Sequence, residues 1–286
     1  MKIALLGANG QLGHDLQIAL QSYDVTPLTR NDVDVTDFAR ARAVLTDIRA
    51  DVVLNTTAYH RVDDCETHPE LAYQVNASAV LNLVRIANDL DAVLVHISTD
   101  YVFDGSVQTP YTETSEPFPL SVYANSKLAG ELLIRAMSRK YFLIRSCGLY
   151  GVAGSRGKGG NFVETMIAKA SRHEPIQVVN DQIVTPTYTV DLADQIVRVL
   201  PTTQYGLFHM TNEGSCTWYE FAKSIFELAG MDADLSPTTS TFYKLPAKRP
   251  QYSVLENARL KELGLNQMRH WRDALAAYLK DKSPGR

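Results

Sequence analysis

The stretch KIALLGANGQLG, residues 2–13, decides the fold of this chain. An apolar run of strand length passes directly into a segment with glycine at positions 7, 10 and 13. A tight turn between a strand and a helix needs backbone angles that glycine adopts easily, and the missing side chains let an anion approach the backbone. The N-terminus of the following helix offers unpaired N–H groups to a phosphate. We interpret Gly7, Gly10 and Gly13 as the pyrophosphate turn of a dinucleotide-binding domain.

Strand-like runs rich in Val, Ile and Leu recur along the chain and alternate with helical patterns, at the spacing of about 30 residues that βαβ units have. The runs after the first are residues 25–28, 52–57, 92–98, 141–145 and 206–211. The helical patterns cover residues 11–22, 37–48, 70–90 and 122–138. This order predicts an α/β fold with a doubly wound parallel sheet of the Rossmann type.

The pattern changes after Tyr150, which suggests a second, smaller lobe. We assign residues 1–150 to an NAD(P)-binding domain, to which the chain returns around 187–212. Residues 151–186 and 213–286 then form an interleaved C-terminal lobe for the substrate. The segment GVAGSRGKGG (151–160) has five glycines and two positive charges, and little to bury. It is either a lid that orders over the ligand or a surface insertion that never meets it.

Bulk composition excludes several classes of protein. The formal net charge is −4, and no Lys/Arg run suggests binding to nucleic acid. No apolar run approaches the roughly 20 residues of a membrane span. The three cysteines (Cys65, Cys147, Cys216) have no C-x-x-C spacing and indicate free thiols in the reducing cytoplasm. The histidines show no metal-binding spacing, so we expect no metal.

The residues after the second predicted strand bear on the choice of cofactor. An acid at this point would bond the ribose 2′-hydroxyl of NAD, whereas an arginine suits the 2′-phosphate of NADP. The chain reads Leu28-Thr29-Arg30, with no acid until Asp32. NADPH is therefore favoured over NADH, with a purely solvated surface position as the alternative for Arg30.

Tyr123 and Lys127 form a Y-x-x-x-K pair at the start of a predicted helix. Residues four apart share a helix face, so the ammonium can lie near the phenol and lower its pKa. The tyrosine can then protonate a carbonyl oxygen as hydride arrives at carbon. The hydroxyl of Thr99, at the end of a strand upstream, can share that oxygen. A second match, Tyr219 with Lys223, follows no such strand, and we interpret Tyr219 as a packing residue.

Five segments together extend the argument beyond single motifs: GANGQLG, STDYVFDG (98–105), YANSK (123–127), NFVETM (161–166) and RPQYS (249–253). This ordered set resembles the dTDP-4-dehydrorhamnose reductases, within the extended short-chain dehydrogenases. The G-x-x-G-x-x-G spacing is typical of that superfamily. The resemblance implies NAD(P)H-dependent reduction of the C4 keto group of dTDP-4-dehydro-L-rhamnose to dTDP-L-rhamnose, a precursor of surface polysaccharide. It is compatible with a homodimer.

The resemblance also implies roles for individual residues. Thr99 would bind the C4 oxygen, Tyr123 would protonate it, and Lys127 would hold the nicotinamide ribose. Further positions that match cofactor contacts are Asn9, Gly10, Gln11, Leu12, Asp34, Val35, Ala58, Tyr59 and His60. Positions that match substrate contacts are Asp100, Tyr101, Asn161 and Arg249. For the last two the alternative is a helix cap and a surface ion pair. Trp218 and Trp271 are expected to pack between helices of the lobe.

Three details of the sequence bear on which substrate the protein uses. Asp100 is followed by Tyr101 where nucleotide-sugar dehydratases of the superfamily have a second carboxylate, which favours plain reduction. Cys147 and its neighbours stand where the reductases commonly have a tryptophan, and Val184 replaces a glycine. A reductase or epimerase of another nucleotide-linked deoxysugar is therefore one alternative. A non-catalytic NADP-binding subunit, like the regulatory subunit of methionine adenosyltransferase, is the other.

Overall fold

A parallel sheet forms the centre of the molecule. The computed structural model describes residues 1–154 and 159–282, and within them six strands pair in the order β10-β5-β4-β3-β1-β2. The strands are β1 (Lys2–Leu6), β2 (Asp24–Leu28), β3 (Val52–Asn55), β4 (Val93–Thr99), β5 (Tyr141–Ser146) and β10 (Gly206–His209). Every pairing in this sheet is parallel. The predicted Rossmann-type sheet is confirmed.

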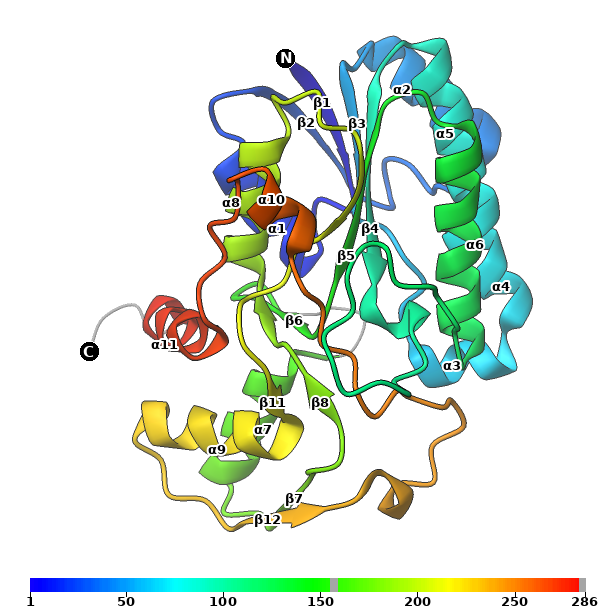
Figure 1. Ribbon diagram of the computed structural model, residues 1–286. Helices are drawn as coiled ribbons and strands as arrows, with labels where there is room; N and C mark the ends of the chain where they lie inside the picture. The colour runs from blue at the N-terminus through cyan, green and yellow to red at the C-terminus, as the bar shows by residue number, and fades with distance from the viewer. Residues whose placement is uncertain (155–158, 283–286) are drawn as a thin grey trace.

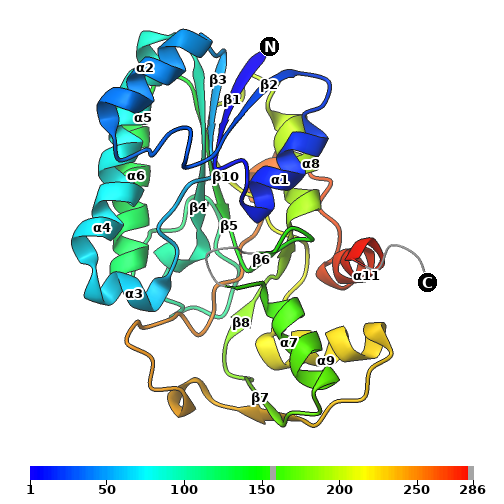
Figure 2. The ribbon, with the colours of Figure 1, turned by 180° about the vertical axis from the view of Figure 1, so that it is seen from behind.

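Helices cover both faces of the sheet (Figures 1 and 2). One face carries α1 (Gln11–Ala19) and α8 (Thr189–Val199), and the other carries α2 (Phe38–Ile48), α5 (Ala79–Asp89) and α6 (Val122–Met137). Each layer has its own apolar core: Leu16, Leu192 and Phe208 belong to the first, and Leu45 and Leu83 to the second. Because the strands are buried on both faces, they read as continuous apolar runs, which is why the sequence identified them.

A smaller lobe lies at the carboxyl ends of the strands (Figure 1). Two small sheets build it: β7 (Ile176–Val179) with β12 (Leu235–Thr238), and β8 (Ile183–Val184) with β11 (Cys216–Thr217). Helices α7 (Phe162–Ser171) and α9 (Trp218–Ala229) pack together in the lobe. Both begin with a capping box, in which Asn161 or Thr217 exchanges hydrogen bonds with a glutamate three residues on.

Four further elements join the lobe to the sheet domain. The short strands β6 (Leu149–Tyr150) and β9 (Thr187–Tyr188) pair in parallel, and α11 (Trp271–Lys282) packs against β9 and α9. Helix α10 (Ala258–Glu262) packs on β10, and its Leu260 belongs to a core of the sheet. The sequence analysis assigned that helix to the lobe, because a chain that returns to a sheet through a five-residue helix leaves no periodic signal.

The predicted helix 70–90 differs in detail. It consists of α4 (Pro69–Tyr73), a π-helical turn (Gln74–Ser78) and α5, and is preceded by α3 (Val62–Thr67). Short 3₁₀ turns occupy Asp100–Val102 and Ser240–Phe242. The segment 151–160, interpreted as either a lid or a surface insertion, includes residues 155–158, with Arg156 and Lys158, which lie outside the described residues.

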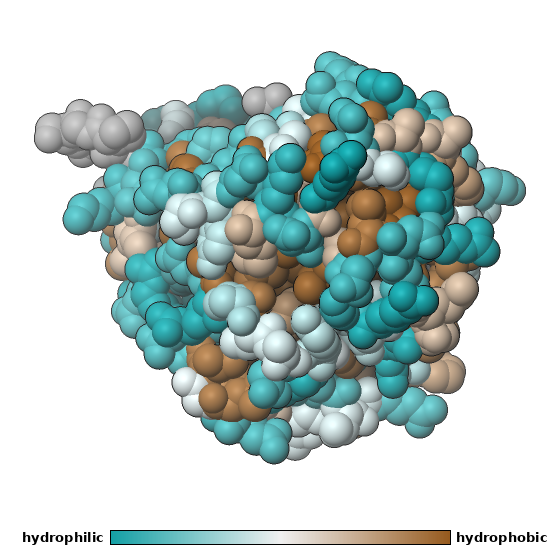
Figure 3. Space-filling model, turned by 90° about the horizontal axis from the view of Figure 1, so that it is seen from above, coloured by the Kyte–Doolittle hydropathy of each residue, from teal (hydrophilic) through white to brown (hydrophobic). Residues whose placement is uncertain are grey.

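The surface at the end of the sheet opposite the lobe is mostly hydrophilic, with apolar side chains between the polar ones (Figure 3). In residues 1–154 and 159–282 no helix has both the length and the apolar character to cross a membrane.

A fully buried ion pair fixes α6 against the sheet. Arg145 on β5 donates from Nη2 to Glu131 on α6 over 2.6 Å, and a second bond runs from Nε. Ser98 on β4 donates its hydroxyl to the same carboxylate, and the two charged side chains are 1% and 0% exposed. This charged cluster therefore holds the ends of β4 and β5 against α6.

We predict that Glu131→Gln lowers the free energy of unfolding by about 3–5 kcal/mol, since it leaves the Arg145 charge buried without a counter-ion. Urea denaturation measures the loss. Glu227→Gln is the control, because it removes an ion pair with Arg272 whose partners are both 44% exposed, and it should change stability little. Equal effects of the two substitutions would contradict the assignment.

Candidate active site

The three predicted catalytic side chains meet where β4 ends and α6 begins. Thr99 is the last residue of β4, and its hydroxyl caps the following 3₁₀ turn by accepting from Tyr101 N. Ser121 caps α6 by accepting from Ala124 N, which fixes the register of Tyr123 and Lys127 on the helix. The side chains of Thr99 and Tyr123 lie close enough to interact. A substrate oxygen placed between these hydroxyls would contact both.

Tyr123 is held as a phenol. Burial raises its pKa above the ordinary value, and the nearby Thr99 hydroxyl offsets part of this rise. The Tyr101 ring packs edge-on against it, with centroids 6.1 Å apart. A protonated tyrosine suits the donation of a proton to a carbonyl oxygen.

Lys127 lies behind the tyrosine, with only 2% of its side chain exposed. Its Nζ donates to the carbonyl oxygen of Ile97 over 2.6 Å and lies 3.2 Å from His96 Nε2. Burial lowers the pKa of Lys127 to about 8, against the opposing effect of the Glu131 carboxylate. The amine can therefore change its charge near neutral pH.

Asp100 is a buried carboxyl group beside Thr99. It accepts from the Thr99 hydroxyl over 3.0 Å and from the Cys147 thiol over 3.0 Å, and it also bonds Ser253. All three are neutral donors, so burial raises the pKa of Asp100. Burial likewise raises the pKa of Cys147, which marks the thiol as a hydrogen-bond donor and not as a nucleophile.

The residues of the glycine turn fit a dinucleotide. Gly7 has φ +81°, and a Cβ at Gly13 would overlap the Gly7 carbonyl oxygen, so both positions require glycine. Gly10 precedes α1, whose first turn carries no acidic residue and receives no side-chain cap. Its N–H groups are thus available to a pyrophosphate. Asn9 is exposed and Leu12 buried, while Gln11 is tied to the Leu149 carbonyl.

Arg30 and Asp34, both predicted to contact the cofactor, contact each other. Arg30 follows β2 and is 80% exposed, and its Nη2 lies 2.9 Å from Asp34 Oδ2. The other oxygen of Asp34 accepts from Thr36, and these bonds lower the pKa of Asp34 against the effect of burial. Val35 is buried in the sheet core. An exposed ion pair of this kind is weak, so Arg30 can exchange Asp34 for a phosphate.

The segment Ala58-Tyr59-His60 follows β3 and is held by a residue that the sequence analysis did not identify. Asn76, in the π-helical turn, accepts from Tyr59 N over 2.9 Å and donates to Tyr59 O over 3.1 Å. It also donates to Ser126 on α6, whose hydroxyl bonds the Tyr123 carbonyl oxygen. One buried amide thus connects the predicted cofactor segment to the helix of the catalytic pair.

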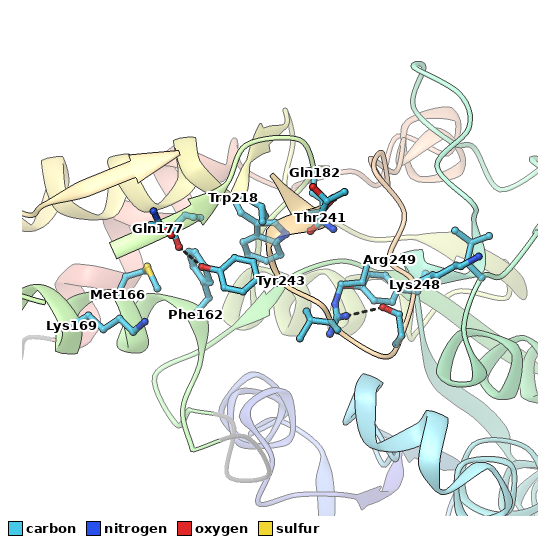
Figure 4. A pocket seen from close by; sticks show the side chains of 17 residues that line it. Phe162, Met166, Lys169, Gln177, Gln182, Trp218, Thr241, Tyr243, Lys248 and Arg249 are labelled. Atoms are coloured by element: carbon cyan, nitrogen blue, oxygen red, sulfur yellow. Dashed lines mark hydrogen bonds between the residues drawn. The ribbon is translucent and has the colours of Figure 1, made fainter. Parts of the chain in front are cut away.

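A cavity of about 630 Å³ is lined mainly by residues of the lobe. Aromatic rings of Phe162, Trp218 and Tyr243 lie toward one end, and Lys248 and Arg249 toward the other (Figure 4). Flat rings suit a nucleobase, and clustered cations suit phosphate oxygens. Tyr101 also lines the cavity and so connects it to Tyr123.

Of the predicted substrate residues, some line the cavity and others bond within the protein. Tyr101 and Arg249 line the cavity, and Arg249 holds a bidentate bond to Asp63 at 2.7 and 3.2 Å. Asn161 is buried, and its amide bonds Gly151, Tyr278 and Glu164 within the protein. The helix-cap alternative describes the bonds that Asn161 makes here.

Sequence reasoning missed most of the cavity. Trp218 was expected only to pack between helices; it does pack on Phe162, yet it also lines the cavity. Tyr243 and Lys248 belong to the loop between β12 and α10, whose composition gives no sign of a ligand. By contrast, Tyr219 packs in the lobe core and Lys223 faces Glu227 on the same helix, far along the chain from Thr99.

Comparison with known proteins agrees with this geometry. The family described as the RmlD substrate binding domain matches residues 1–283. The spore coat polysaccharide biosynthesis protein SpsK of Bacillus subtilis is 37% identical over 99% of this chain and 98% of its own. A dTDP-4-dehydrorhamnose reductase of Streptomyces griseus is 39% identical over 94% and 90%.

A solved structure supports the same relationship. The dTDP-4-dehydrorhamnose reductase of Bacillus anthracis, in complex with NADP, has a TM-score of 0.93 and 38% identity over 98% of this chain and 99% of its own. With a family match across almost every residue and relatives above 30% identity over the full length, the chain belongs to the RmlD family of NAD(P)H-dependent dTDP-sugar 4-ketoreductases.

Proposed function

We propose that this protein reduces the C4 keto group of dTDP-4-dehydro-L-rhamnose to the alcohol of dTDP-L-rhamnose, with NADPH as the favoured reductant, in the cytoplasm. The observation that carries the proposal is that Tyr101, whose ring packs against Tyr123, also lines a cavity with aromatic rings and cations. The cavity suits a nucleoside diphosphate, and the hydroxyl pair suits a carbonyl oxygen.

Each residue has a defined task in this reaction. The reduced nicotinamide, when bound, supplies hydride to the C4 carbon. Thr99 orients the C4 oxygen, and Tyr123 gives it the phenolic proton, so that the carbonyl becomes a hydroxyl group. Lys127 holds the nicotinamide ribose and supports return of a proton to the phenol. Asp100 and Tyr101 line the sugar end.

The substrate is the finer part of the proposal, because Cys147 and Val184 depart from the reductase pattern at the sugar end. One relative from Streptomyces antibioticus, 39% identical, is named a probable dTDP-4,6-dihydroxy-2-methyloxan-3-one 4-ketoreductase. A different 4-keto deoxysugar is accordingly the second candidate. The buried thiol of Cys147 supports it, since this side chain bonds Asp100 directly and so shapes the sugar end of the site.

The test is a panel of nucleotide-linked 4-keto sugars with the purified protein and NADPH. We expect oxidation of NADPH, followed by absorbance at 340 nm, only when a keto sugar is present, with the largest kcat/KM for dTDP-4-dehydro-L-rhamnose. NMR of the product identifies the new C4 alcohol. A larger kcat/KM for another sugar would select the second candidate, and no turnover with any sugar would favour the regulatory-subunit alternative.

We predict that Tyr123→Phe lowers kcat by about 10²–10⁴-fold, because the phenylalanine ring still packs but has no proton to donate. NADPH binding, measured by fluorescence titration, should be nearly unchanged. Tyr219→Phe is the matched control, since it alters the other Y-x-x-x-K pair, and it should retain wild-type turnover. The reverse result would mean that the wrong pair was assigned.

We predict that Arg30→Ala weakens NADPH binding by roughly tenfold or more and leaves NADH binding almost unchanged. The reason is the loss of a charged hydrogen bond to the 2′-phosphate, on the order of 1.5–3 kcal/mol. Titration of each cofactor measures the two dissociation constants. Asp34→Asn is a useful control, because it releases Arg30 from its ion pair while keeping the guanidinium. Equal losses for both cofactors in Arg30→Ala would give Arg30 a structural role only.

A further inference from the structure

His96 is a buried histidine that the proposed reaction does not use. It lies on β4, is 1% exposed, and faces Lys127 on one side and Asn55 of β3 on the other. The parallel register pairs Asn55 directly with His96, so the two side chains lie together in the sheet layer. The contact from Asn55 Nδ2 to His96 Nδ1 is 3.0 Å, and that from His96 Nε2 to Lys127 Nζ is 3.2 Å.

Thr57 fixes the orientation of the Asn55 amide. Its backbone N–H donates to Asn55 Oδ1 over 3.0 Å, and its hydroxyl reaches the same oxygen over 2.6 Å. A backbone N–H can only donate, so this atom of Asn55 must be the oxygen. The NH₂ group therefore points at His96, and it too can only donate.

The polarity of the next contact follows. His96 Nδ1 must accept from Asn55, so the neutral ring carries its proton on Nε2. A protonated ring would place its Nδ1–H against the NH₂ group of Asn55, so that two donors would face each other. Burial and the Lys127 charge also lower the pKa of His96 well below its ordinary value. The Nε2–H then points at Lys127 Nζ. An ammonium group only donates and cannot accept this bond, whereas a neutral amine has one lone pair to accept it.

We propose that Asn55 and His96 are positioning residues that fix the polarity of this hydrogen-bond chain and thereby favour the neutral amine of Lys127. The hydrogen-bond chain runs from Thr57 through Asn55 and His96 to Lys127, and each member donates to the next. In its charged state Lys127 faces the Nε2–H of His96 and has no lone pair with which to accept this hydrogen bond. In the neutral state each of these contacts has one donor and one acceptor.

The other groups around Lys127 do not reverse this preference. On its own helix, Glu131 favours the ammonium, but its carboxylate is engaged by Arg145 of β5 and Ser98 of β4. Tyr123, also on α6, is a neutral phenol. The Ile97 carbonyl accepts from either form of the amine. Burial acts in the same direction as His96, and the pKa of Lys127 is about 8.

The consequence for catalysis rests on the proposed role of Lys127. A lysine that changes charge near neutral pH can pass a proton toward the Tyr123 phenolate after each turnover, whereas one fixed as an ammonium acts only as a charge. The histidine would then set the pH range of proton return without contacting substrate.

The first test uses the wild-type protein alone. NMR of protein labelled with ¹⁵N-histidine reports the tautomer of His96, and the ¹³Cε resonance of Lys127, assigned with Lys127→Met, reports its titration. We expect a neutral His96 with its proton on Nε2 and a Lys127 midpoint well below the ordinary value of about 10.4. The proton on Nδ1, or an ordinary lysine midpoint, would overturn the proposal.

The second test reverses the direction of the hydrogen bonds between residue 55 and Lys127. It uses Asn55→Asp, because aspartate has nearly the same shape as asparagine. The carboxylate accepts from Thr57 as before and also from His96, so the ring moves its proton to Nδ1 and offers a lone pair to Lys127. We expect the Lys127 midpoint to rise by about one pH unit or more. In the His96→Leu background the same substitution should have a much smaller effect, since the ring that transmits it is absent.

His209→Leu is the matched control. His209, on β10, is a second fully buried histidine, and its ring is bonded to the carbonyl oxygen of Tyr111. Its loss therefore reports the general cost of removing a buried ring. It should leave the Lys127 titration unchanged. A Lys127 midpoint that is the same in Asn55→Asp and wild type would overturn the proposal, even if the enzyme is active. Conversely, the expected midpoints in a protein that reduces no sugar would leave this inference standing and refute the proposed function.

Discussion

The buried ion pair between Glu131 and Arg145 is the constraint on which the site depends. It joins α6 to β5, and through Ser98 to the end of β4, in the buried interior. Glu131 lies one helical turn beyond Lys127, so the same contact that holds the helix also sets the depth of the lysine. Burying two charges is costly unless both are paired, which makes the geometry of this cluster strict. Thr99, Tyr123 and Lys127 thus keep their relative positions because their supporting charges cannot be moved apart.

The cofactor side depends on a different device. Between β1 and α1, a side chain at Gly13 would meet the Gly7 carbonyl oxygen, and Gly7 itself has a positive φ and lies against the Thr56 side chain. After the neighbouring strand β3, the segment at Tyr59 is held by Asn76, which lies in a π-helical turn. Such turns are rare and often occur at functional sites, because the extra residue redirects one side chain. Here it lets a single amide reach both Tyr59 and Ser126, so the predicted cofactor segment and the catalytic helix are held together.

The lobe supplies most of the residues that line the cavity. Its loop between β12 and α10 contributes Tyr243, Lys248 and Arg249 to the cavity, and α9 contributes Trp218. Close to the catalytic hydroxyls, Cys147 and Ser253 approach Asp100 from two segments distant in sequence. Loops on a rigid sheet can vary without disturbing the hydride-transfer geometry, which explains how one family serves several dTDP-sugars.

The sequence by itself determined the parallel sheet, the glycine turn and the Tyr123–Lys127 pair, since each depends on local spacing. Strands buried on both faces read as apolar runs, a turn without Cβ atoms reads as glycines, and two residues four apart share a helix face. Only the tertiary structure decided what surrounds them. Asn76, His96 and Trp218 carry no local signal, because their roles come from contacts with residues tens of positions away. The direction of a hydrogen bond likewise depends on all the partners in the hydrogen-bond chain. The connection from Asn55 through His96 to Lys127 could therefore be identified only from the tertiary structure.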